Sequence, residues 1–390
     1  MASNGFPSGC LWRGLRGVER FKGFVRLGSR TIGMDIDRGA IKAVQISGAG
    51  GDNVLQHVGY HRLPPGAVVD GEVADQDLLA AEIREFWDSH SFGGKSVIIG
   101  VSNPKVVVRL LDFPHMESED LKGAIGFEAQ EHIPMPLEAA VLDYLVLGPR
   151  EEGSDLDRVL VVAAQREMIE RYTSALRAGG LRPVGVDHKA LSLTRSILPD
   201  PFFAEEGAVV LLDVGFEITN LVITDRGRPL LTRFIPGGMG HFVADVADAA
   251  DLPTDEAEKQ ALSPRVGLGQ DQAVGEEDAP EEDDFDPALV YDVRRGLENA
   301  AQVLADNVQG SLEHHHSQAG TREVSRVLVS GEGALISGLD VYLGELLGIA
   351  TSRGNPVGRL SANRSNVSDE QLRAMEPVLA VAFGLALEDE

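Results

Sequence analysis

Two stretches of the chain share one pattern of apolar and polar positions, residues 31–46 (TIGMDIDRGAIKAVQI) and residues 209–224 (VVLLDVGFEITNLVIT). In each, an apolar run ends in an aspartate, a short polar turn follows, and a second apolar run alternates with polar positions. This pattern predicts a β-hairpin with an acidic residue at its mouth. Such a turn directs several backbone N–H groups into one cavity, which suits a phosphate. Asp35 and Asp213 are expected to hold Mg²⁺ through water, so the two hairpins predict a nucleoside triphosphate gripped from both sides.

The segment between the hairpins alternates strands with helices, which predicts a small inserted α/β unit. An Asn-Pro turn separates what reads as two strands of one sheet, at 95–100 and 106–113. The helix expected at 118–132 has Ser118 and Asp120 near its start as caps. The other expected elements are helices at 77–89 and 166–178 and strands at 141–147 and 159–164.

The same plan continues after the second hairpin. Residues 270–287 contain nine acidic side chains, no basic one and two prolines, so they are expected to be a solvated loop. A strand at 324–329 runs into a glycine turn at 330–334 (SGEGA), and an alanine-rich helix is expected at 375–387. The other expected elements are a strand at 228–235, a turn at 236–240, a helix to residue 250, a helix at 254–262 and a helix at 291–316.

Composition restricts the class of protein. The chain has 390 residues, of which 43% are hydrophobic and 25% charged, and this size suits two domains. A formal net charge of −26 disfavours general nucleic-acid binding, which needs clustered cations. The single cysteine, Cys10, excludes a disulfide framework and favours a reducing cytosolic setting. No apolar run approaches the roughly 18–20 residues that span a bilayer.

Residues 1–30 differ from the rest of the chain in charge. They carry six lysines and arginines against one acid, Glu19, and large apolar residues are interleaved with the basic ones. Such a segment can form a basic amphipathic helix on anionic lipid. The alternative is a flexible leader without fixed structure.

The glycine turn at 330–334 completes the set of binding motifs. A strand, a glycine-rich turn and a helix allow the backbone to approach a flat ligand closely. In the order hairpin, hairpin, glycine turn, the chain resembles the actin-like ATPase superfamily, whose motifs bind phosphate, phosphate and adenosine. This resemblance implies a ribonuclease H-like α/β fold with two lobes and a nucleotide between them.

The run from 97 to 147 narrows the resemblance. Its strand, proline-led segment, helix with Phe-Glu-Ala, Ile-Pro pair and Asp-Tyr strand are similar to the PilM family, the cytoplasmic actin-like proteins of type IV pilus assembly. The related FtsA family has an extra subdomain at the position of residues 114–188. The likeness extends from about 31 to 387, and implies a first lobe at 31–200 with that subdomain and a second lobe at 201–390.

The PilM resemblance also implies a function. The resemblance implies an ATP-binding cytoplasmic adaptor that lies at the inner face of the cell membrane. There it would belong to the type IV pilus assembly platform, together with other platform proteins. The partner in this family is the short cytoplasmic tail of the membrane protein PilN, which lies in a groove between the first lobe and the extra subdomain. Attachment to the membrane would come from this partner or from the basic segment 1–30, with no nucleic acid involved.

The resemblance assigns site residues by position in the motifs. Asp35 and Asp213 match the Mg²⁺-associated aspartates, and Lys42 matches the lysine that reaches the phosphates. Thr219 is expected to donate its hydroxyl to phosphate or water, and Glu258 to contact the ribose. The full expected nucleotide set is Asp35, Gly39, Lys42, Asp213, Gly215, Thr219, Asn220, Glu258, Lys259, Gly331, Gly333 and Ala334.

Three positions depart from the family pattern. Asp37 places a carboxylate where the backbone should meet phosphate, and Glu332 replaces a glycine of the adenosine turn. Ala261 stands where the family has a lysine, so Lys259 is taken as its substitute. Together these departures predict a site that binds nucleotide weakly.

Other functions remain open at this point. An FtsA-like cell-division protein, an active ATPase or a small-molecule kinase would share the fold. Slow or no hydrolysis is expected, because only Glu217 lies in a phosphate turn as a candidate to align water. A metal shared by Glu313 and His316 is a weak alternative. A groove beside residues 106–147 would favour peptide docking, whereas a cavity deep in the cleft would favour a substrate.

Overall fold

The computed structural model describes residues 32–48, 52–150, 153–198, 207–269, 286–318 and 321–387. Residues 1–30 and 270–285, for which the sequence predicts a leader and most of an acidic loop, lie outside these ranges. Within the described residues, none of the helices has both the length and the apolar character that a bilayer crossing requires.

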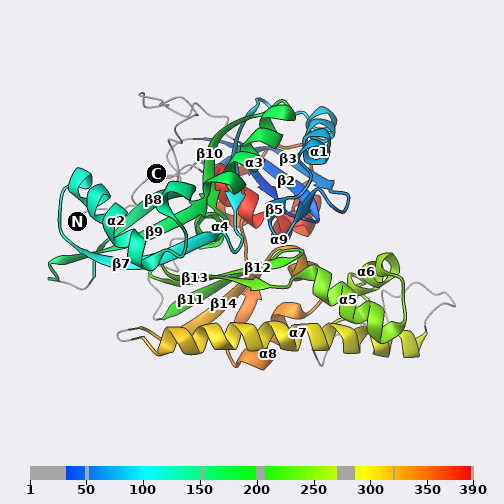
Figure 1. Ribbon diagram of the computed structural model, residues 1–390. Coiled ribbons are helices and arrows are strands. Elements are labelled where there is room, and N and C mark those ends of the chain that lie inside the picture. The colour runs from blue at the N-terminus through cyan, green and yellow to red at the C-terminus, as the bar shows by residue number, and fades with distance from the viewer. Residues whose placement is uncertain are drawn as a thin grey trace.

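Two β-sheets with the same strand order form the body of the molecule (Figure 1). In the first, β1 (Ile32–Ile36), β2 (Ala40–Ser47) and β3 (Val54–Arg62) are antiparallel neighbours, and β6 (Ser96–Val101) and β10 (Arg182–His188) continue in parallel from β1. In the second, β11 (Ala208–Val214), β12 (Ile218–Asp225) and β13 (Arg228–Pro236) are antiparallel, and β14 (Val324–Ser330) and β15 (Thr351–Arg353) continue in parallel from β11. The repeated plan confirms both predicted hairpins.

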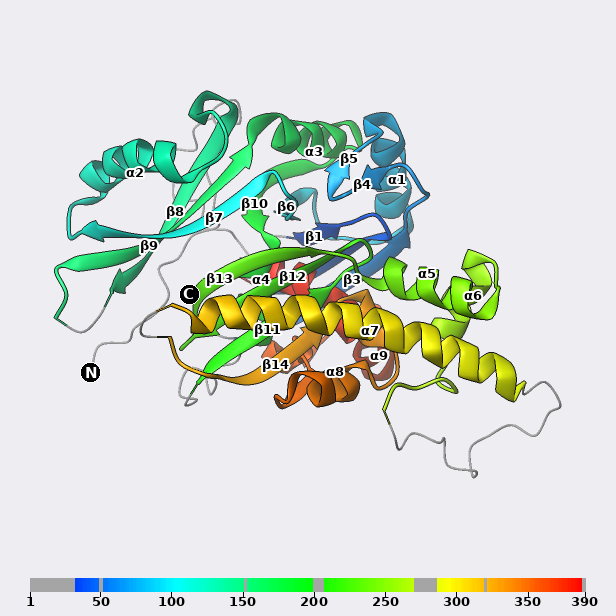
Figure 2. The same cartoon turned by 60° about the horizontal axis from the view of Figure 1, so that its bottom comes forward.

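Helices cover the outer side of each sheet. On the first, α1 (Gln76–Ser89) and α3 (Arg166–Ala178) pack together over a short hairpin of β4 (Val68–Val69) and β5 (Glu72–Val73). On the second, the thirty-residue α7 (Pro287–His316) lies along the layer (Figure 2). It packs with α5 (Met239–Ala250), α6 (Thr254–Ala261) and α8 (Leu339–Leu347).

Two buried helices lie between the sheets. Residues of α4 (Lys189–Ile197) and α9 (Asp369–Ala386) share one apolar cluster with β6 of the first sheet and with β11, β12 and β14 of the second. Every residue from Pro377 to Ala386 is buried, which fits a helix that is apolar on all sides. The two lobes are therefore joined through a common core.

The closing helix differs from its predicted extent and place. It begins at Asp369, where Ser368 and Gln371 form a capping box, and not at residue 375. It packs on β1, β2 and β6, and the short β16 (Ala362–Asn363) pairs with β3, so both complete the first sheet. The sequence-based division assigned this segment to the second lobe because its position in the chain follows that lobe.

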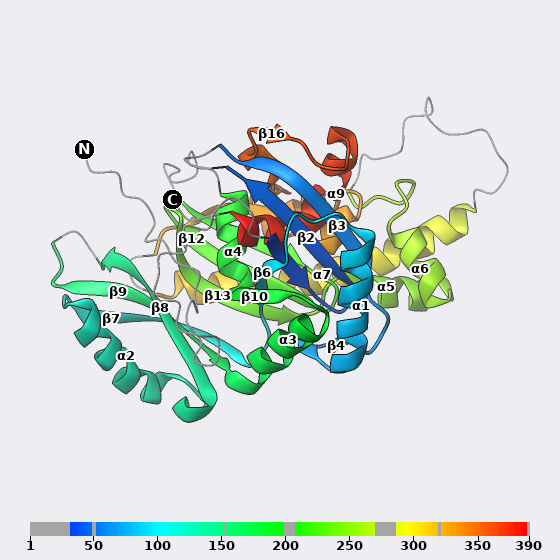
Figure 3. The same ribbon diagram turned by 90° about the horizontal axis from the view of Figure 1, so that it is seen from above.

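A separate three-stranded sheet projects from one side of the body (Figure 3). It has the order β7-β9-β8, formed by β7 (Val106–Pro114), β8 (Ala140–Pro149) and β9 (Leu156–Gln165), with α2 (Ser118–His132) packed on one face. The inserted unit thus spans β7 to β9 and not 114–188, because α3 packs on α1 and β10 joins the first sheet.

Two local predictions in this unit are wrong. The strands expected at 95–100 and 106–113 belong to different sheets: β6 is buried in the first sheet, whereas β7 is an edge strand of the small one. The N-cap of α2 is Glu117, and no side chain caps it by a hydrogen bond. Ser118 and Asp120 lie inside the first turn, where acidic side chains favour the helix through its dipole.

Candidate functional site

The tips of the two hairpins meet across the cleft between the lobes. Arg38 of the first turn pairs with Glu217 of the second, with 3.0 Å between Nε and Oε1, and its guanidinium lies 4.7 Å from the centre of the Phe216 ring. Further out, Arg62 at the end of β3 pairs with Glu258 of α6. These contacts hold the cleft closed on the side where a nucleotide is expected.

Lys42 lies at the centre of the cleft among three carboxylates. Its Nζ is 2.5 Å from Asp37 Oδ2, 3.2 Å from Glu332 Oε1 and 3.5 Å from Asp35 Oδ2. The lysine is only 2% exposed. Burial alone would lower the pKa of its ammonium, but the charges of Asp37, Glu332 and Asp35 raise that pKa well above its ordinary value. Lys42 is therefore a permanent cation that already has anionic partners.

The Asp37 side chain occupies the turn that was predicted to receive phosphate. Its Oδ1 accepts hydrogen bonds from the backbone N–H groups of Gly39 (2.8 Å) and Ala40 (3.0 Å), while Oδ2 faces Lys42. Although burial raises the pKa of Asp37, the nearby Lys42 and Lys189 hold it below its ordinary value. Asp37 is thus an ionised carboxylate in the place of a ligand anion.

Sequence reasoning did not identify Lys189, the first residue of α4. Its Nζ lies 2.7 Å from Asp35 Oδ1 and donates to the carbonyl of Ile36 at 3.0 Å. Asp35, which is 3% exposed, therefore bridges two ammonium groups. In the sequence Lys189 follows Asp187 and His188 within a stretch of mixed polarity, and that pattern does not reveal which partner the lysine has.

The second hairpin contributes Asp213 and Asn220, which lie opposite each other. The Asn220 amide donates to Asp213 Oδ2 at 3.0 Å, and its side-chain oxygen accepts from the Ser102 hydroxyl of the first lobe. Burial, and then repulsion by Asp35, raises the pKa of Asp213 to about 6. Asp35 and Asp213 therefore lie in one electrostatic environment, as the hairpin pattern predicts.

Thr219 does not fit its predicted role. The residue is fully buried, and its hydroxyl donates to the Gly237 carbonyl at 2.7 Å, in the turn before α5. The neighbouring strand position, Asn220, faces Asp213 instead, because successive side chains of a strand point to opposite faces. Thr219 stabilises the turn and does not face the cleft as a donor to phosphate.

The side of the cleft that was expected to receive adenosine contains a small cavity of about 230 Å³. Gly39, Glu258 and Glu332 line it together with Tyr60 and Phe216. The structure thus brings three positions from separate motifs to one cavity, although only Gly39 and Glu258 were predicted as ligand contacts. Glu332 adds a carboxylate to its wall.

The remaining predicted residues face elsewhere. Lys259 is exposed and pairs with Glu256 at 3.3 Å, so it does not replace the missing lysine at Ala261. Gly331 has a φ of +85°, and a Cβ there would lie 2.5 Å from the Val214 carbonyl oxygen. Positions 331, 333 and 334 are buried against β11, while the close approach at Gly215 is to Ile218. These glycines are required first by packing within the chain.

No metal site stands out among the described residues, since no group of three or more histidine, cysteine or acidic side chains is arranged to hold an ion. Asp35 and Asp213 are carboxylates of the type that binds Mg²⁺ through water, but here lysines contact both oxygens of Asp35 and an asparagine donates to Oδ2 of Asp213.

Replacing Glu332 by glutamine is expected to stabilise the protein at alkaline pH. Burial, and then the charge of Asp37, raises the pKa of Glu332 to about 7. Above the ordinary pKa of about 4.5, the unfolded state loses the proton of Glu332 while the folded state keeps it. The free energy of unfolding of the wild type therefore falls as the pH rises from 4.5 towards 7. Glu332→Gln should match the wild type at pH 5 and exceed it by on the order of 2 kcal/mol at pH 8.

Urea unfolding at several pH values checks this expectation. The quantity to compare is the difference between variant and wild type, because burial lowers the pKa of His188 to about 4 and gives the wild type an opposite trend at low pH. A difference that does not change between pH 5 and pH 8 would contradict the assigned environment of Glu332.

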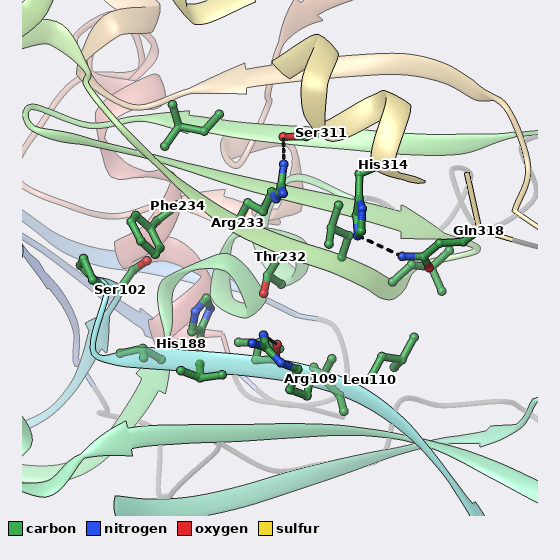
Figure 4. Close-up of a pocket in the computed structure, with 18 of the residues that line it drawn as sticks. Ser102, Arg109, Leu110, His188, Thr232, Arg233, Phe234, Ser311, His314 and Gln318 are labelled. Carbon is green, nitrogen blue, oxygen red and sulfur yellow. Dashed lines mark hydrogen bonds between the residues drawn. The ribbon is translucent and has the colours of Figure 1, made fainter. Parts of the chain in front are cut away.

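A larger cavity lies away from the cleft, between the projecting sheet and the second lobe. It has a volume of about 1160 Å³ and is bordered by β7 and β13, with the end of α7 and residues 102–104 and His188 of the first lobe (Figure 4). Among the described strands, β7 and β13 are edge strands of their sheets, so each has one side without a neighbouring strand. Phe234 of β13, 37% exposed, lies on its wall.

The wall of this cavity is more basic than the protein as a whole. Four arginines and two aspartates line it, in a chain whose net charge is −26. Arg109 donates to the Val108 carbonyl and Arg233 to the Ser311 hydroxyl, and within the described part of the chain neither has an acidic partner. The groove combines free strand edges, apolar side chains and cationic groups.

Comparison with solved structures identifies the fold as actin-like. Over 92% of this chain and 98% of the other, the structure is similar to that of the PilM-PilN type IV pilus biogenesis complex, with a TM-score of 0.76 and 27% identity. A more distant likeness is to MreB5 of Spiroplasma citri bound to ADP, with a TM-score of 0.50 and 14% identity over 91% of this chain and 94% of the other. The predicted two-lobe α/β fold is confirmed.

Sequence comparison gives the family. Cell division protein FtsA of Bacillus subtilis is 21% identical over 258 residues, which cover 58% of this chain and only 56% of that protein. The family model described as type IV pilus assembly protein PilM matches residues 33–274 and 291–390, which is nearly the whole described chain. The chain therefore belongs to the PilM family of type IV pilus assembly proteins.

Proposed function

We propose that this protein is an adaptor of the type IV pilus inner-membrane platform and docks the N-terminal cytoplasmic tail of a PilN-like membrane protein. The observation that carries the proposal is the position of the cavity of about 1160 Å³, which runs beside β7 and not deep in the cleft. The likeness to a PilM-PilN complex at 27% identity supports the choice of partner. Recruitment through that tail would place the protein at the cytoplasmic face of the membrane, among other platform proteins.

The two free strand edges favour an extended conformation of the tail. A peptide that adds a strand to β7 or β13 gains main-chain hydrogen bonds, and its alternate side chains enter the cavity. Phe234 offers an aromatic contact of the kind that dominates the energy of interfaces. Phe234→Ala is therefore expected to weaken binding of a synthetic tail peptide at least tenfold, measured by fluorescence anisotropy.

Phe127→Ala is the matched control for this experiment. Phe127 is the same residue type, is 71% exposed, and lies on α2 outside the cavity. Its substitution should leave peptide affinity unchanged. A second peptide with N-methyl groups at alternate backbone positions should bind more weakly than the parent if strand addition contributes. Equal affinity for both variants and the wild type would contradict docking in this groove.

We further propose that the cleft is a nucleotide site, with ATP and Mg²⁺ as the ligands. Asp35, Lys42 and Asp213 would face the phosphates and the hydrated metal, and Glu258 the ribose. The donor types fit the ligand, but their arrangement fits only in part, because Asp37 fills the first phosphate turn and Lys42 is surrounded by carboxylates. Mg²⁺ would supply charge neutralisation to the phosphates.

The same geometry favours an adaptor over an enzyme. Glu217, the one candidate for aligning water, is held by Arg38 and by the backbone N–H of Asp70 at 2.8 Å. Hydrolysis is therefore proposed to be slow or absent. An active ATPase or a kinase would need a free base and a substrate cavity in the cleft, where the described residues leave about 230 Å³. An FtsA-like role has weaker support, since the FtsA match spans little more than half of that protein.

A further inference from the structure

We infer that Asp37, together with Glu332, acts as a built-in competitor of the phosphates, so that these two carboxylates set the affinity of the cleft for polyphosphate anions. The inference rests on the proposed nucleotide site and concerns which residues control it. Its basis is that the groups a phosphate would use already bind an anionic side chain.

Asp37 uses three donors at once. One oxygen accepts from two successive turn N–H groups, at Gly39 and Ala40, and the other lies 2.5 Å from the Lys42 ammonium. Backbone N–H groups of a turn and a lysine are the elements that hold phosphate oxygens in nucleotide sites. A phosphate can reach them only after the Asp37 side chain leaves. The donors of the turn are therefore used by a side chain of the protein itself.

Glu332 reaches the same ammonium from the other lobe. It belongs to the glycine turn after β14, its side chain is 8% exposed, and its Oε1 lies 3.2 Å from Lys42 Nζ. Its other oxygen lies 3.1 Å from the position that a Cβ at Gly39 would take, at the tip of the first hairpin. A single lysine thus links carboxylates of both lobes, which is the bridging role that the anion of a bound nucleotide would have.

The charge balance predicts the direction of the effect. Asp35, Asp37 and Glu332 surround Lys42, so an incoming triphosphate meets like charges at short range in a buried site. Removing Asp37 releases two N–H donors and one cation and also removes a repulsion. Removing the charge of Glu332 also lowers the repulsion and takes one partner from the Lys42 ammonium, but it releases no backbone N–H donor. Asp37→Gly should therefore raise affinity more than Glu332→Gln.

The test is isothermal titration calorimetry of the full chain at pH 8 with Mg-ATP, Mg-ADP and AMP. The variants are Asp37→Gly, Asp37→Asn and Glu332→Gln, with Asp52→Asn as the matched control that removes one exposed charge elsewhere. We expect Asp37→Gly to bind Mg-ATP at least tenfold more tightly than the wild type, with a smaller gain for Glu332→Gln and none for Asp52→Asn. AMP should gain little, because it lacks the outer phosphates.

Asp37→Asn keeps the shape of the side chain and covers the case in which the glycine variant fails to fold. It should also gain affinity, but less, because its amide oxygen can still accept from the turn. If the wild type binds Mg-ATP and neither Asp37→Gly nor Asp37→Asn changes the affinity, the inference is overturned but the proposed nucleotide site stands. Equal gains for AMP and ATP would also overturn it, because they indicate general opening of the cleft. If neither the wild type nor any variant binds a nucleotide, the proposed nucleotide site is overturned together with the inference. The proposed peptide docking is tested by a separate measurement and does not depend on this result.

Discussion

Lys42→Met is expected to lower the free energy of unfolding by about 3–5 kcal/mol at pH 8, the usual cost of leaving buried charges without their partner. Asp35, Asp37 and Glu332 would then face one another without the ammonium that lies within 3.5 Å of each. Lys189 would remain as the ion-pair partner of Asp35, and its charge would still act on Asp37 from a greater distance. Urea unfolding followed by circular dichroism measures the loss.

The loss should depend on pH in a defined way. Because the pKa of Glu332 is raised to about 7, this group takes up a proton below neutrality and the repulsion falls, so the deficit at pH 6 should be smaller than at pH 8. The double variant Lys42→Met/Glu332→Gln should recover part of the stability at pH 8. Lys122→Met, an exposed change on α2, should stay within about 0.5 kcal/mol of the wild type. A deficit equal at both pH values would contradict the coupling to Glu332.

Gly384→Ala is expected to destabilise the protein by about 3 kcal/mol, although alanine is normally the better helix former. Gly384 lies in α9 at its contact with α4, where a Cβ would lie 1.8 Å from the Ser192 carbonyl oxygen. The two helices would have to move apart, and this would disrupt the apolar core that joins the two sheets. Thermal and urea unfolding of the purified variant would measure this.

Gly310→Ala provides the control with the opposite sign. Gly310 lies in α7, and a Cβ there would meet no atom within 4 Å. The same substitution should therefore stabilise the protein by roughly 0.5–1 kcal/mol through helix propensity. If Gly384→Ala were also neutral or stabilising, the close contact between α4 and α9 would not exist in solution.

The fold could be predicted where local pattern decides structure. Both hairpins follow from alternation and a polar turn, and the helix of residues 118–132 follows from its spacing. Partner choice between strands is not a local property. The strands before and after the Asn-Pro turn are adjacent in the chain yet join different sheets, and nothing within either strand encodes that separation.

The candidate site could be predicted in outline for the same reason. The motif order placed Asp35, Lys42 and Asp213 in one cleft, and the structure brings their charges together. The sequence shows that positions 37 and 332 depart from the family pattern. It does not show that both carboxylates contact the same lysine. Thr219 was misassigned because a strand register decides which of two neighbouring side chains faces the cleft.

The first sheet is completed by residues that follow its first strands by about 300 positions in the chain. Its strand β3 pairs with β16, the Val58 N–H donates to the Asn366 side chain 308 positions away, and α9 packs on β1. A nascent chain that still lacks these residues cannot complete its first lobe on the ribosome, even though the other strands of that sheet have already been made. Pairings of such large sequence separation slow folding. Until translation reaches α9, the buried faces of β1 and β2 need protection from aggregation, so this protein is expected to depend on chaperones during synthesis.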